Sequence, residues 1–457
     1  MKQAVKHNAR FVAAQVLSRI EPKRDYAAAI LNRMLDKTDQ RQRATDLVFG
    51  TLRNLTAIDA VINALSGCPV QRIQKKLLNI VRIGCYEIVY TPSAAKHSIV
   101  NEAAQSTKTI AGQKQVGFVN ALLRQILRHI INHQTPLSKA NIKRNLPLNI
   151  ETGCEFDMDF LPDFEKEPAE YLSTVFSLPQ WLVTDWLTEF GREKTHEICF
   201  ACNRRPSVYI RVNTLKITPD ELKAKFEQDN IELEKVHVIG SENMLRVKSP
   251  GVVSLLPGYD EGLFMVQDLT ASLPVKLLNP QKGWKILDLC AAPGGKTAQL
   301  AEVTGDLASI IATDYDSERL VKVKENIDRL GIKSVEVANY NEIEGMEFDC
   351  ILLDVPCSNT GVLAKRIEVR FRLEPESIAE FAKTQRELLE RATSMIRPYG
   401  TTCYSTCSIQ RQENSDIVRD FLSSHVNFEL VTEQQIVPSA DIIDYDGGYT
   451  AIIKRLS

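Results

Sequence analysis

Apolar residues recur at helical spacing through the first part of the chain. The segment "VGFVNALLRQILRHI" places Phe118, Leu122 and Ile126 four residues apart, and Arg124 and Arg128 fall outside this stripe. The segment "RIQKKLLNIVRIGCYEIVY" is apolar on most of its faces, which indicates a central, buried helix. Because this part shows no alternation of the β type, the pattern predicts an all-helical domain over residues 1–135.

The pattern changes after Pro136. The segment "ETGCEFDMDFLPDFEKEPAE" is acidic, contains two prolines and has no clear period, which predicts an acidic linker over residues 136–170. Two apolar runs, "SVYIRVN" and "NMLRVK", then flank "TPDELKAKFEQDN", in which Thr218 can cap a helix and Pro219 can occupy its first position. Strands around one helix predict a small α+β, RRM-like module over residues 171–262.

From residue 263 to residue 457, strand-like and helix-like segments alternate. The helix-containing segments are "WKILDLCAAPGGKTAQLAEV" and "ASIIATDYDSERLVKVKENIDRLG", and the strand-like runs after them are "SVEVANY", "FDCILLDVPC" and "GTTCYSTCS". Apolar strands that alternate with helices predict a doubly wound parallel sheet, so this part should be an α/β, Rossmann-like domain.

Length and composition agree with this division. A chain of 457 residues is long enough for roughly three domains, and 44% apolar with 25% charged residues is typical of a soluble globular protein. No apolar stretch approaches the roughly 20 residues of a membrane span, and the first residues lack a signal-peptide pattern. The ten cysteines, mostly inside apolar segments, indicate reduced thiols. We therefore expect a cytoplasmic protein without a membrane partner.

Charge is distributed unevenly along the chain. Residues 1–145 contain 23 lysines and arginines against 8 acidic residues, a balance of +15, whereas the remainder contains 33 against 50. A positive balance of this size indicates a polyanion as partner, and nucleic acid is the favoured one. The alternative is a solvated helical surface with no partner.

The segment "ILDLCAAPGGKT" predicts a strand, a loop of small residues and a helix that begins near Gly295. Small residues let a ligand approach the backbone closely. A phosphate loop would need glycine at position 290, which is Cys290 here, and the dinucleotide pattern G-x-G-x-x-G is absent. Asp288 and Asp314 end successive strands, where an acid can bind a ribose diol. An acidic site suits a nucleoside without phosphates, and the sulfonium cation S-adenosylmethionine fits best.

Several cysteines compete as candidate reactive groups. Cys199 and Cys202 form a lone C-x-x-C without a second pair at zinc spacing, so we predict no metal site. Cys357 and Cys407 follow predicted strand ends and adjoin polar loops, which favours chemical roles for both.

Four segments resemble the signature motifs of the Sun/Fmu family of RNA cytosine-5 methyltransferases: "LDLCAAPGGKT", "ATDYD", "LLDVPCSNTGV" and "YSTCSIQRQEN". The basic front part, with "AAKHSIVNEAAQ" and "GFVNALLR", is similar to the NusB-like domain of the bacterial ribosomal RNA enzymes of that family. The resemblance implies S-adenosylmethionine-dependent methylation of C5 of a cytosine in 16S ribosomal RNA. It also implies a monomer that acts on naked RNA or on an early assembly intermediate.

The resemblance also implies roles for individual residues. Cys407 would attack C6 of the cytosine as the nucleophile, and Cys357 would serve release of the product. Asp354 would contact the edge of the base and border the donor, Asp314 would bind the donor's ribose, and Asn339 stands where the family usually has an aspartate near the adenine. The donor loop would be Cys290, Ala291, Ala292, Pro293, Gly294, Gly295 and Lys296.

One segment departs from the family. Relatives tend to read Arg-Arg-x-Pro-Asp-x-x-Trp where this chain has "LAKRIEVRFRLEP", so that Ile367, Glu368 and Phe371 replace the proline, aspartate and tryptophan. The segment remains basic, which predicts RNA contact through these side chains: Lys365, Arg366, Arg370 and Arg372.

Two other functions compete with this one. The front part alone would suit a non-catalytic RNA-binding or transcription-antitermination factor, but the donor loop and two strand-end thiols favour an enzyme. The same chemistry on transfer RNA is separated from the ribosomal reaction only by the front domain.

Overall fold

A computed structural model describes residues 6–21, 23–236 and 241–457. The chain divides into two compact units. The first contains Met1–Arg204 and Leu363–Leu373, and the second contains Arg205–Val362 and Glu374–Ser457. Within the described residues, no helix combines the length and the hydrophobicity that crossing a membrane requires.

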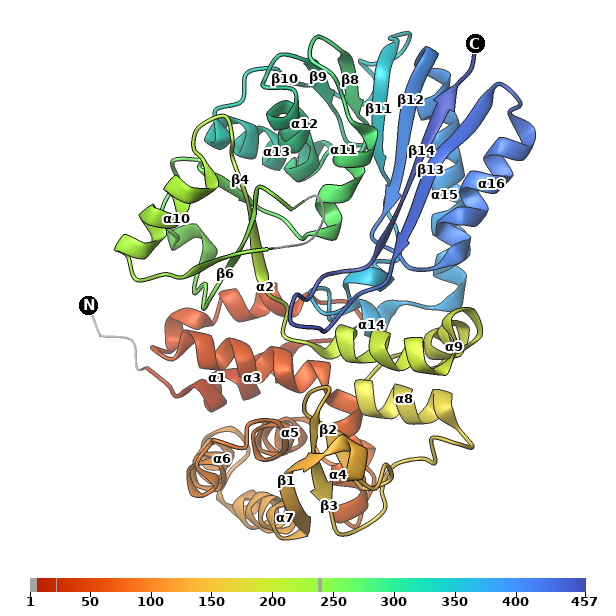
Figure 1. Cartoon of the computed structure of the whole chain (residues 1–457). Coiled ribbons are helices and arrows are strands. Elements are labelled where there is room, and N and C mark those ends of the chain that lie inside the picture. Colours follow the sequence, from red (N-terminus) through yellow and green to blue (C-terminus); the bar gives the residue numbers. More distant parts are fainter. Residues whose placement is uncertain (1–5, 22, 237–240) are drawn as a thin grey trace. The chain divides into compact units, whose positions relative to one another are not determined.

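The first unit begins with seven helices (Figure 1). The predicted central helix is confirmed, because α5 packs against α1, α3, α4, α6 and α7 and buries most of its side chains. Asn8 caps α1 by accepting a hydrogen bond from the backbone N–H of Phe11. The helices are α1 (Ala9–Arg19), α2 (Ala27–Asn32), α3 (Arg41–Arg53), α4 (Leu55–Leu65), α5 (Lys75–Tyr90), α6 (Lys96–Ile110) and α7 (Val116–His129).

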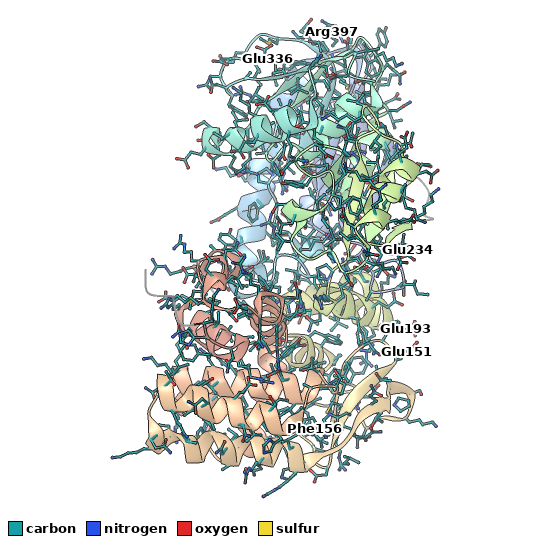
Figure 2. The ribbon with its side chains drawn as sticks, turned by 90° about the vertical axis from the view of Figure 1, so that its left-hand side faces the viewer. Glu151, Phe156, Glu193, Glu234, Glu336 and Arg397 are labelled. Atoms are coloured by element: carbon teal, nitrogen blue, oxygen red, sulfur yellow. The ribbon has the colours of Figure 1, made fainter. Side chains whose placement is uncertain are left out.

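A three-stranded antiparallel sheet follows in the order β1-β3-β2, with β1 (Ile130–Pro136), β2 (Asn145–Pro147) and β3 (Thr152–Phe156). The prediction of an acidic linker over residues 136–170 is therefore wrong. Phe156, labelled in Figure 2, is buried. Its ring packs edge to face on that of Phe160. The acidic side chains that suggested a linker form surface ion pairs, such as Arg144 with Asp159 at 2.5 Å.

Two further helices, α8 (Pro168–Phe176) and α9 (Gln180–Asn203), also belong to the first unit. Thr56 on α4 donates a hydrogen bond to the carbonyl oxygen of Thr174 on α8 at 2.9 Å. The first residues of the predicted small module, 171–204, thus lie in the first unit. The chain returns to the first unit at Leu363–Leu373, which contains α14 (Val369–Arg372).

The second unit opens with a small antiparallel sheet in the order β5-β6-β4-β7 and one helix. The predicted cap is confirmed, because the Thr218 side chain accepts from the N–H of Glu221 and Glu221 accepts from the N–H of Thr218. Leu222 and Phe226 are buried with Phe264 in the module's core. The elements are β4 (Val208–Val212), α10 (Pro219–Gln228), β5 (Leu233–Lys235), β6 (Met244–Val247) and β7 (Phe264–Val266).

A seven-stranded sheet in the order β10-β9-β8-β11-β12-β14-β13 forms the rest of this unit. The strands from β10 to β12 are parallel, but β14 is antiparallel to both β12 and β13, so the sheet is mixed rather than wholly parallel as predicted. Most of β13 is exposed, as an edge strand can be. The strands are β8 (Lys285–Asp288), β9 (Ser309–Ala312), β10 (Val335–Val337), β11 (Phe348–Asp354), β12 (Ile396–Thr406), β13 (Phe428–Ile436) and β14 (Gly448–Arg455).

Helices cover both faces of this sheet (Figure 1). Alternate strand residues face opposite layers: Leu352 packs in the core that includes α11, α12 and α13, and Leu353 packs in the core with α15 and α16. The carboxyl ends of β8, β9, β11 and β12 therefore meet along one edge, where ligands bind in such sheets. The helices are α11 (Leu273–Leu278), α12 (Gly295–Val303), α13 (Ser317–Leu330), α15 (Pro375–Ser394) and α16 (Ser415–Ser424).

Candidate active site

The predicted site residues of the second unit lie beyond the carboxyl ends of four neighbouring parallel strands. Asp288 is the last residue of β8, and Asp314 lies two residues after β9. Asp354 is the last residue of β11 and pairs in register with Ser405 on β12, one residue before the end of that strand. The sheet thus gathers three carboxylates and the cysteines that follow β11 and β12 at one edge.

The loop between β8 and α12 needs its glycine. Gly294 has φ +98°, and a Cβ there would lie 3.2 Å from the Cα of Val323, so a side chain would be both strained and crowded. Two side chains of α13 hold the loop from outside: Arg319 donates to the carbonyl oxygen of Ala292 at 3.0 Å, and Asn326 donates to that of Pro293 at 2.9 Å. Arg319 and Asn326 were not predicted from the sequence to hold the loop, although they share one face of α13.

Asp314 and Asn339 also lie at this edge. Asp314 is buried and accepts hydrogen bonds from the N–H of Ala292 and the N–H of Asp316, each at 3.1 Å. Asn339 donates from its side-chain amide to Glu342 at 2.8 Å, which leaves its amide oxygen directed away from that carboxylate. Glu342 thus places a carboxylate beside the Asn339 side chain.

Lys296 connects the loop with β11. Its Nζ donates to Asp354 Oδ2 at 2.6 Å, and the Ser405 hydroxyl donates to the other oxygen of Asp354 at 2.8 Å. Burial works to lower the pKa of Lys296, but the charge and hydrogen bond of Asp354 outweigh it, so the pKa of Lys296 is raised. The Asp354 side chain is 33% exposed and can reach a ligand while its orientation is fixed from two sides.

Asp288 differs from the other carboxyl groups. It is fully buried, and burial raises its pKa to about 7, although the hydrogen bond from Thr297 at 2.7 Å opposes this shift. Its Oδ1 atom has no hydrogen-bond partner among the described residues. A buried polar atom of this kind can receive a donor from a bound ligand.

We expect Asp288 to make the ligand-free protein less stable as pH rises from about 4 to about 7. In that interval the unfolded chain ionises this carboxyl group while the folded protein keeps it protonated, so the unfolded state binds fewer protons and gains stability. The effect is at most about 4 kcal/mol and ends above the folded pKa. Urea titrations across this range measure the free energy of unfolding of the protein and of Asp288→Asn. With rising pH, the unsubstituted protein should lose stability relative to the variant. A constant difference would contradict the prediction.

The two predicted reactive cysteines lie side by side. Cys357 Sγ is 3.1 Å from Cys407 Sγ, and the Cys407 thiol also donates to the Asn359 amide oxygen at 3.3 Å. The hydrogen bond with Cys407, together with burial, raises the pKa of Cys357 well above its usual value. Cys357 therefore keeps its proton at neutral pH and can donate it to the neighbouring sulfur.

Several residues that hold these cysteines were missed in the sequence. Asn359 has φ +62° and donates to the carbonyl oxygen of Cys357 at 2.8 Å, which turns its amide oxygen toward Cys407. Gly361 donates its N–H to the carbonyl oxygen of Cys407 at 3.0 Å, and a Cβ there would lie only 2.6 Å from Gly447. Glu413 is buried beneath both loops. The repeated Cys-Ser pair in "PCS" and "TCS" was the available signal.

The basic segment after the first cysteine is only partly available for the predicted RNA contact. Arg370 is buried in the first unit and donates to the carbonyl oxygens of Phe176 and Cys202, at 3.1 and 3.0 Å. These atoms lie at helix C-terminal ends, where carbonyl groups lack helical partners. Arg372 lies over the Tyr26 ring, and of the four basic residues predicted to contact RNA only Lys365 and Arg366 are exposed.

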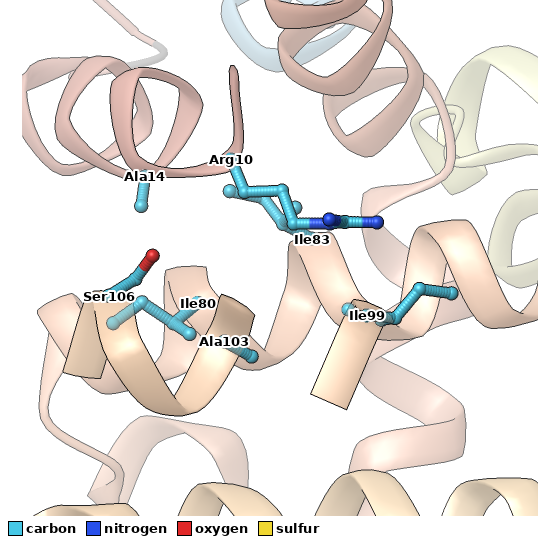
Figure 3. Close-up of a pocket in the computed structure, with 8 residues that line it drawn as sticks. Arg10, Ala14, Ile80, Ile83, Ile99, Ala103 and Ser106 are labelled. Carbon is cyan, nitrogen blue, oxygen red and sulfur yellow. The ribbon is translucent and has the colours of Figure 1, made fainter. Parts of the chain in front are cut away.

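Other candidate sites are weaker. Cys199 and Cys202 are buried in α9, and among the described residues no group of three or more His, Cys, Asp or Glu side chains could hold a metal ion. A small pocket in the first unit has a mostly aliphatic lining from α1, α5 and α6 (Figure 3). Its charged member, Arg10, forms ion pairs with Glu87 and Glu102, so the guanidinium is committed to protein partners.

The edge of the large sheet therefore combines three features. A loop of small residues can admit a nucleoside close to the backbone, and three carboxyl groups around it suit a cation. The unpartnered oxygen of Asp288 fits a ligand that carries a donor group. The thiols of Cys357 and Cys407 lie in contact and can supply a soft nucleophile. Lys296 orients the nearby carboxylate of Asp354.

Family models match three parts of the chain. Residues 7–128 match the NusB family, residues 178–254 match the ferredoxin-like domain of Methyltr_RsmF/B-like proteins, and residues 275–449 match the 16S rRNA methyltransferase RsmB/F model. The matches agree with the predicted order of a NusB-like domain, a small α+β module and a Rossmann-like methyltransferase domain.

Curated relatives match over most of their length. Ribosomal RNA small subunit methyltransferase B of Cronobacter sakazakii is 31% identical over 93% of this chain and 91% of the relative. The probable ribosomal RNA small subunit methyltransferase B of Bacillus subtilis is 28% identical over 93% and 90%.

Solved structures support the fold. The crystal structure of PH0851 covers 99% of this chain and 100% of that chain, with a TM-score of 0.73 and 24% identity. The structure of NSun6 from Pyrococcus horikoshii with SFG covers 61% and 98%, with a TM-score of 0.55 and 21% identity.

Proposed function

Since the chain belongs to the RsmB/F family of 16S ribosomal RNA methyltransferases, we propose that it methylates C5 of one cytosine in that RNA through a covalent bond from Cys407 to C6. The observation that carries this proposal is the pair of sulfur atoms 3.1 Å apart, beside the Asp354–Lys296 ion pair. Because 16S ribosomal RNA is assembled in the cytoplasm, the activity belongs there.

Covalent catalysis overcomes the low nucleophilicity of cytosine. C5 is too electron-poor to attack a methyl group directly, but addition of the Cys407 thiolate at C6 converts the ring into an enamine-like nucleophile. The target base must leave its stack to reach the thiol, which favours an unpaired nucleotide. Asp354, held by Lys296 and Ser405, contacts the N3 and N4 edge of the base and stabilises the adduct.

Release of the product requires that the bond between Cys407 and C6 break. A general base takes the proton from C5, the electrons of that C–H bond re-form the C5–C6 double bond, and the electrons of the C6–S bond return to Cys407. The protonated Cys357 thiol, 3.1 Å away, donates a hydrogen bond to the departing sulfur and makes it a better leaving group. Two thiols are needed because one bonds to the base and the other assists its departure.

The residues around the small-residue loop hold the methyl donor. When bound, S-adenosylmethionine supplies an electrophilic methyl group on a sulfonium centre. Asp314 binds the ribose diol, Asn339 accepts from the adenine's amino group, and the loop from Cys290 to Lys296 borders the amino acid part. Asp354 places negative charge near the cation, and the unpartnered oxygen of Asp288 can accept a hydrogen bond from the donor.

The helical first domain docks the RNA. The +15 balance of residues 1–145 supplies charge for phosphate contacts, and Arg124 and Arg128 lie exposed one turn apart on α7. Phosphate contacts position an RNA without reading its sequence, so this domain contributes affinity while the pocket selects the base.

The double substitution Arg124→Glu/Arg128→Glu should weaken RNA binding about tenfold or more and make its salt dependence shallower, because about two phosphate contacts are lost. Filter binding at several salt concentrations measures both quantities. Arg124→Lys/Arg128→Lys keeps the charge and is the matched control, so it should retain most of the affinity. Unchanged affinity and slope in the glutamate variant would favour the alternative of a solvated surface.

Methyl transfer to defined RNA tests the proposed reaction. The protein is incubated with donor carrying a tritiated methyl group and with 16S ribosomal RNA that lacks modification, and the RNA is then digested to nucleosides. We expect the label in 5-methylcytidine at one position, with transfer RNA as the negative control. Label in another nucleoside, or equal labelling of transfer RNA, would contradict the proposal.

A further inference from the structure

One buried carboxylate lies between the two loops that carry the reactive cysteines. Glu413 Oε1 accepts from the N–H of Ser358 at 2.8 Å, and its Oε2 accepts from the hydroxyl groups of both Ser358 and Ser408, the latter at 2.5 Å. Glu413, Ser358 and Ser408 are all buried. The same side chain therefore binds the residue that directly follows each cysteine.

Neighbouring groups complete this arrangement. Gln385 on α15 donates to Glu413 Oε1 at 3.1 Å and to the carbonyl oxygen of Pro356 at 2.9 Å. Thr360 lies 3.0 Å from the Ser408 hydroxyl and accepts from the N–H of Ile409 at the same distance. Strand pairing ends at Asp354 and Ser405, so beyond that point these side-chain hydrogen bonds and the backbone bond from Gly361 to Cys407 join the loops after β11 and β12.

We propose that Glu413 is a positioning residue that holds the Cys357 and Cys407 thiols in contact by clamping the two Cys-Ser pairs to one carboxylate. The significance of the clamp for product release rests on the proposed function, but the clamp itself does not. Without Glu413, four buried donors lose their acceptor, and the two loops are held together less firmly, by bonds such as those from Gly361 to Cys407 and from Ile409 to Thr360. The contact between the sulfur atoms then weakens, because the two serines keep only hydroxyl contacts with each other, at 3.1 Å, and with Thr360.

Chelation of a trivalent arsenical measures whether the thiols are in contact, without RNA or methyl donor. Phenylarsine oxide bonds to two adjacent thiols with loss of water. We expect the protein to bind it through Cys357 and Cys407, and Cys357→Ser to lose this binding. Glu413→Ala should weaken chelation at least about tenfold, because the effective concentration of the second thiol falls when the loops separate.

Three variants distinguish positioning from stability. Glu413→Gln keeps an acceptor for the N–H groups and can donate to the hydroxyl groups, so it should restore most of the chelation. Ser408→Ala removes one arm and should weaken chelation less than Glu413→Ala does. Leu389→Ala, a core substitution on α15, should lower the melting temperature while chelation stays at the level of the unsubstituted protein.

The outcomes separate this proposal from the proposed function. Tight chelation in both Glu413→Ala and Ser408→Ala, or equal loss in Leu389→Ala, would overturn the clamp whether or not the protein methylates RNA. Absence of chelation in the unsubstituted protein would also overturn it. A protein that chelates as expected but does not label cytosine would retain the clamp and lose the proposed reaction.

Discussion

Cys407→Ala should lower methyl transfer by at least about 10⁴-fold, the order of loss seen when a covalent nucleophile is removed. The cytosine ring is activated only after a thiolate adds to C6, and no other sulfur among the described residues replaces Cys407 in this geometry, since Cys357 is buried and has a raised pKa. Single-turnover transfer of labelled methyl to unmodified 16S ribosomal RNA measures the loss.

Binding measurements separate this loss of chemistry from a loss of structure. Cys407→Ala should bind donor and RNA nearly as the unsubstituted protein does, yet form no covalent complex. Cys403→Ala is the matched control, because Cys403 lies four residues earlier in the core of β12 and should keep most of the activity. Substantial methyl transfer by Cys407→Ala would show that another group attacks C6.

The sequence was sufficient where local pattern and chemistry coincide. The strand that ends at Asp288 and the helix that begins at Gly295 follow from an apolar run, small residues and a helical period. The pairing of Cys357 with Cys407 could be expected because parallel neighbouring strands end at the same edge. The roles of the two thiols, in contrast, came from resemblance and not from pattern.

Other features depend on contacts between distant segments. Arg370 looked like an RNA-binding residue because its charge is visible in the sequence, whereas its acceptors are carbonyl groups of helices that lie more than a hundred residues earlier. Strands β2 and β3 were hidden in the segment predicted to be a linker, and β1 contradicts the last residues of the predicted all-helical domain, because short strands leave little alternation. Glu413 was missed for the same reason as Arg370, since its partners come from three separate elements.

Cys357→Ala should trap the protein on its RNA. Cys407 can still attack C6 and the methyl group can still transfer, but the departing sulfur loses the thiol that lies 3.1 Å away and donates to it. The methylated adduct should then accumulate as a protein–RNA complex that survives denaturing electrophoresis, and multiple turnover should fall much more than the first turnover. Labelled methyl in the trapped complex would show that transfer precedes the block.

The double substitution Cys357→Ala/Cys407→Ala provides the matched control, because without the attacking sulfur no covalent complex should form. The reverse pattern, a trapped complex with Cys407→Ala and none with Cys357→Ala, would exchange the two roles. That exchange would make the buried Cys357 the nucleophile, although its thiol has a raised pKa. Cys357 lies at the start of the loop that Asn359 and Gly361 hold against Cys407. The contact between the sulfur atoms fits either order of events, so the trapped species decides which thiol forms the bond to C6.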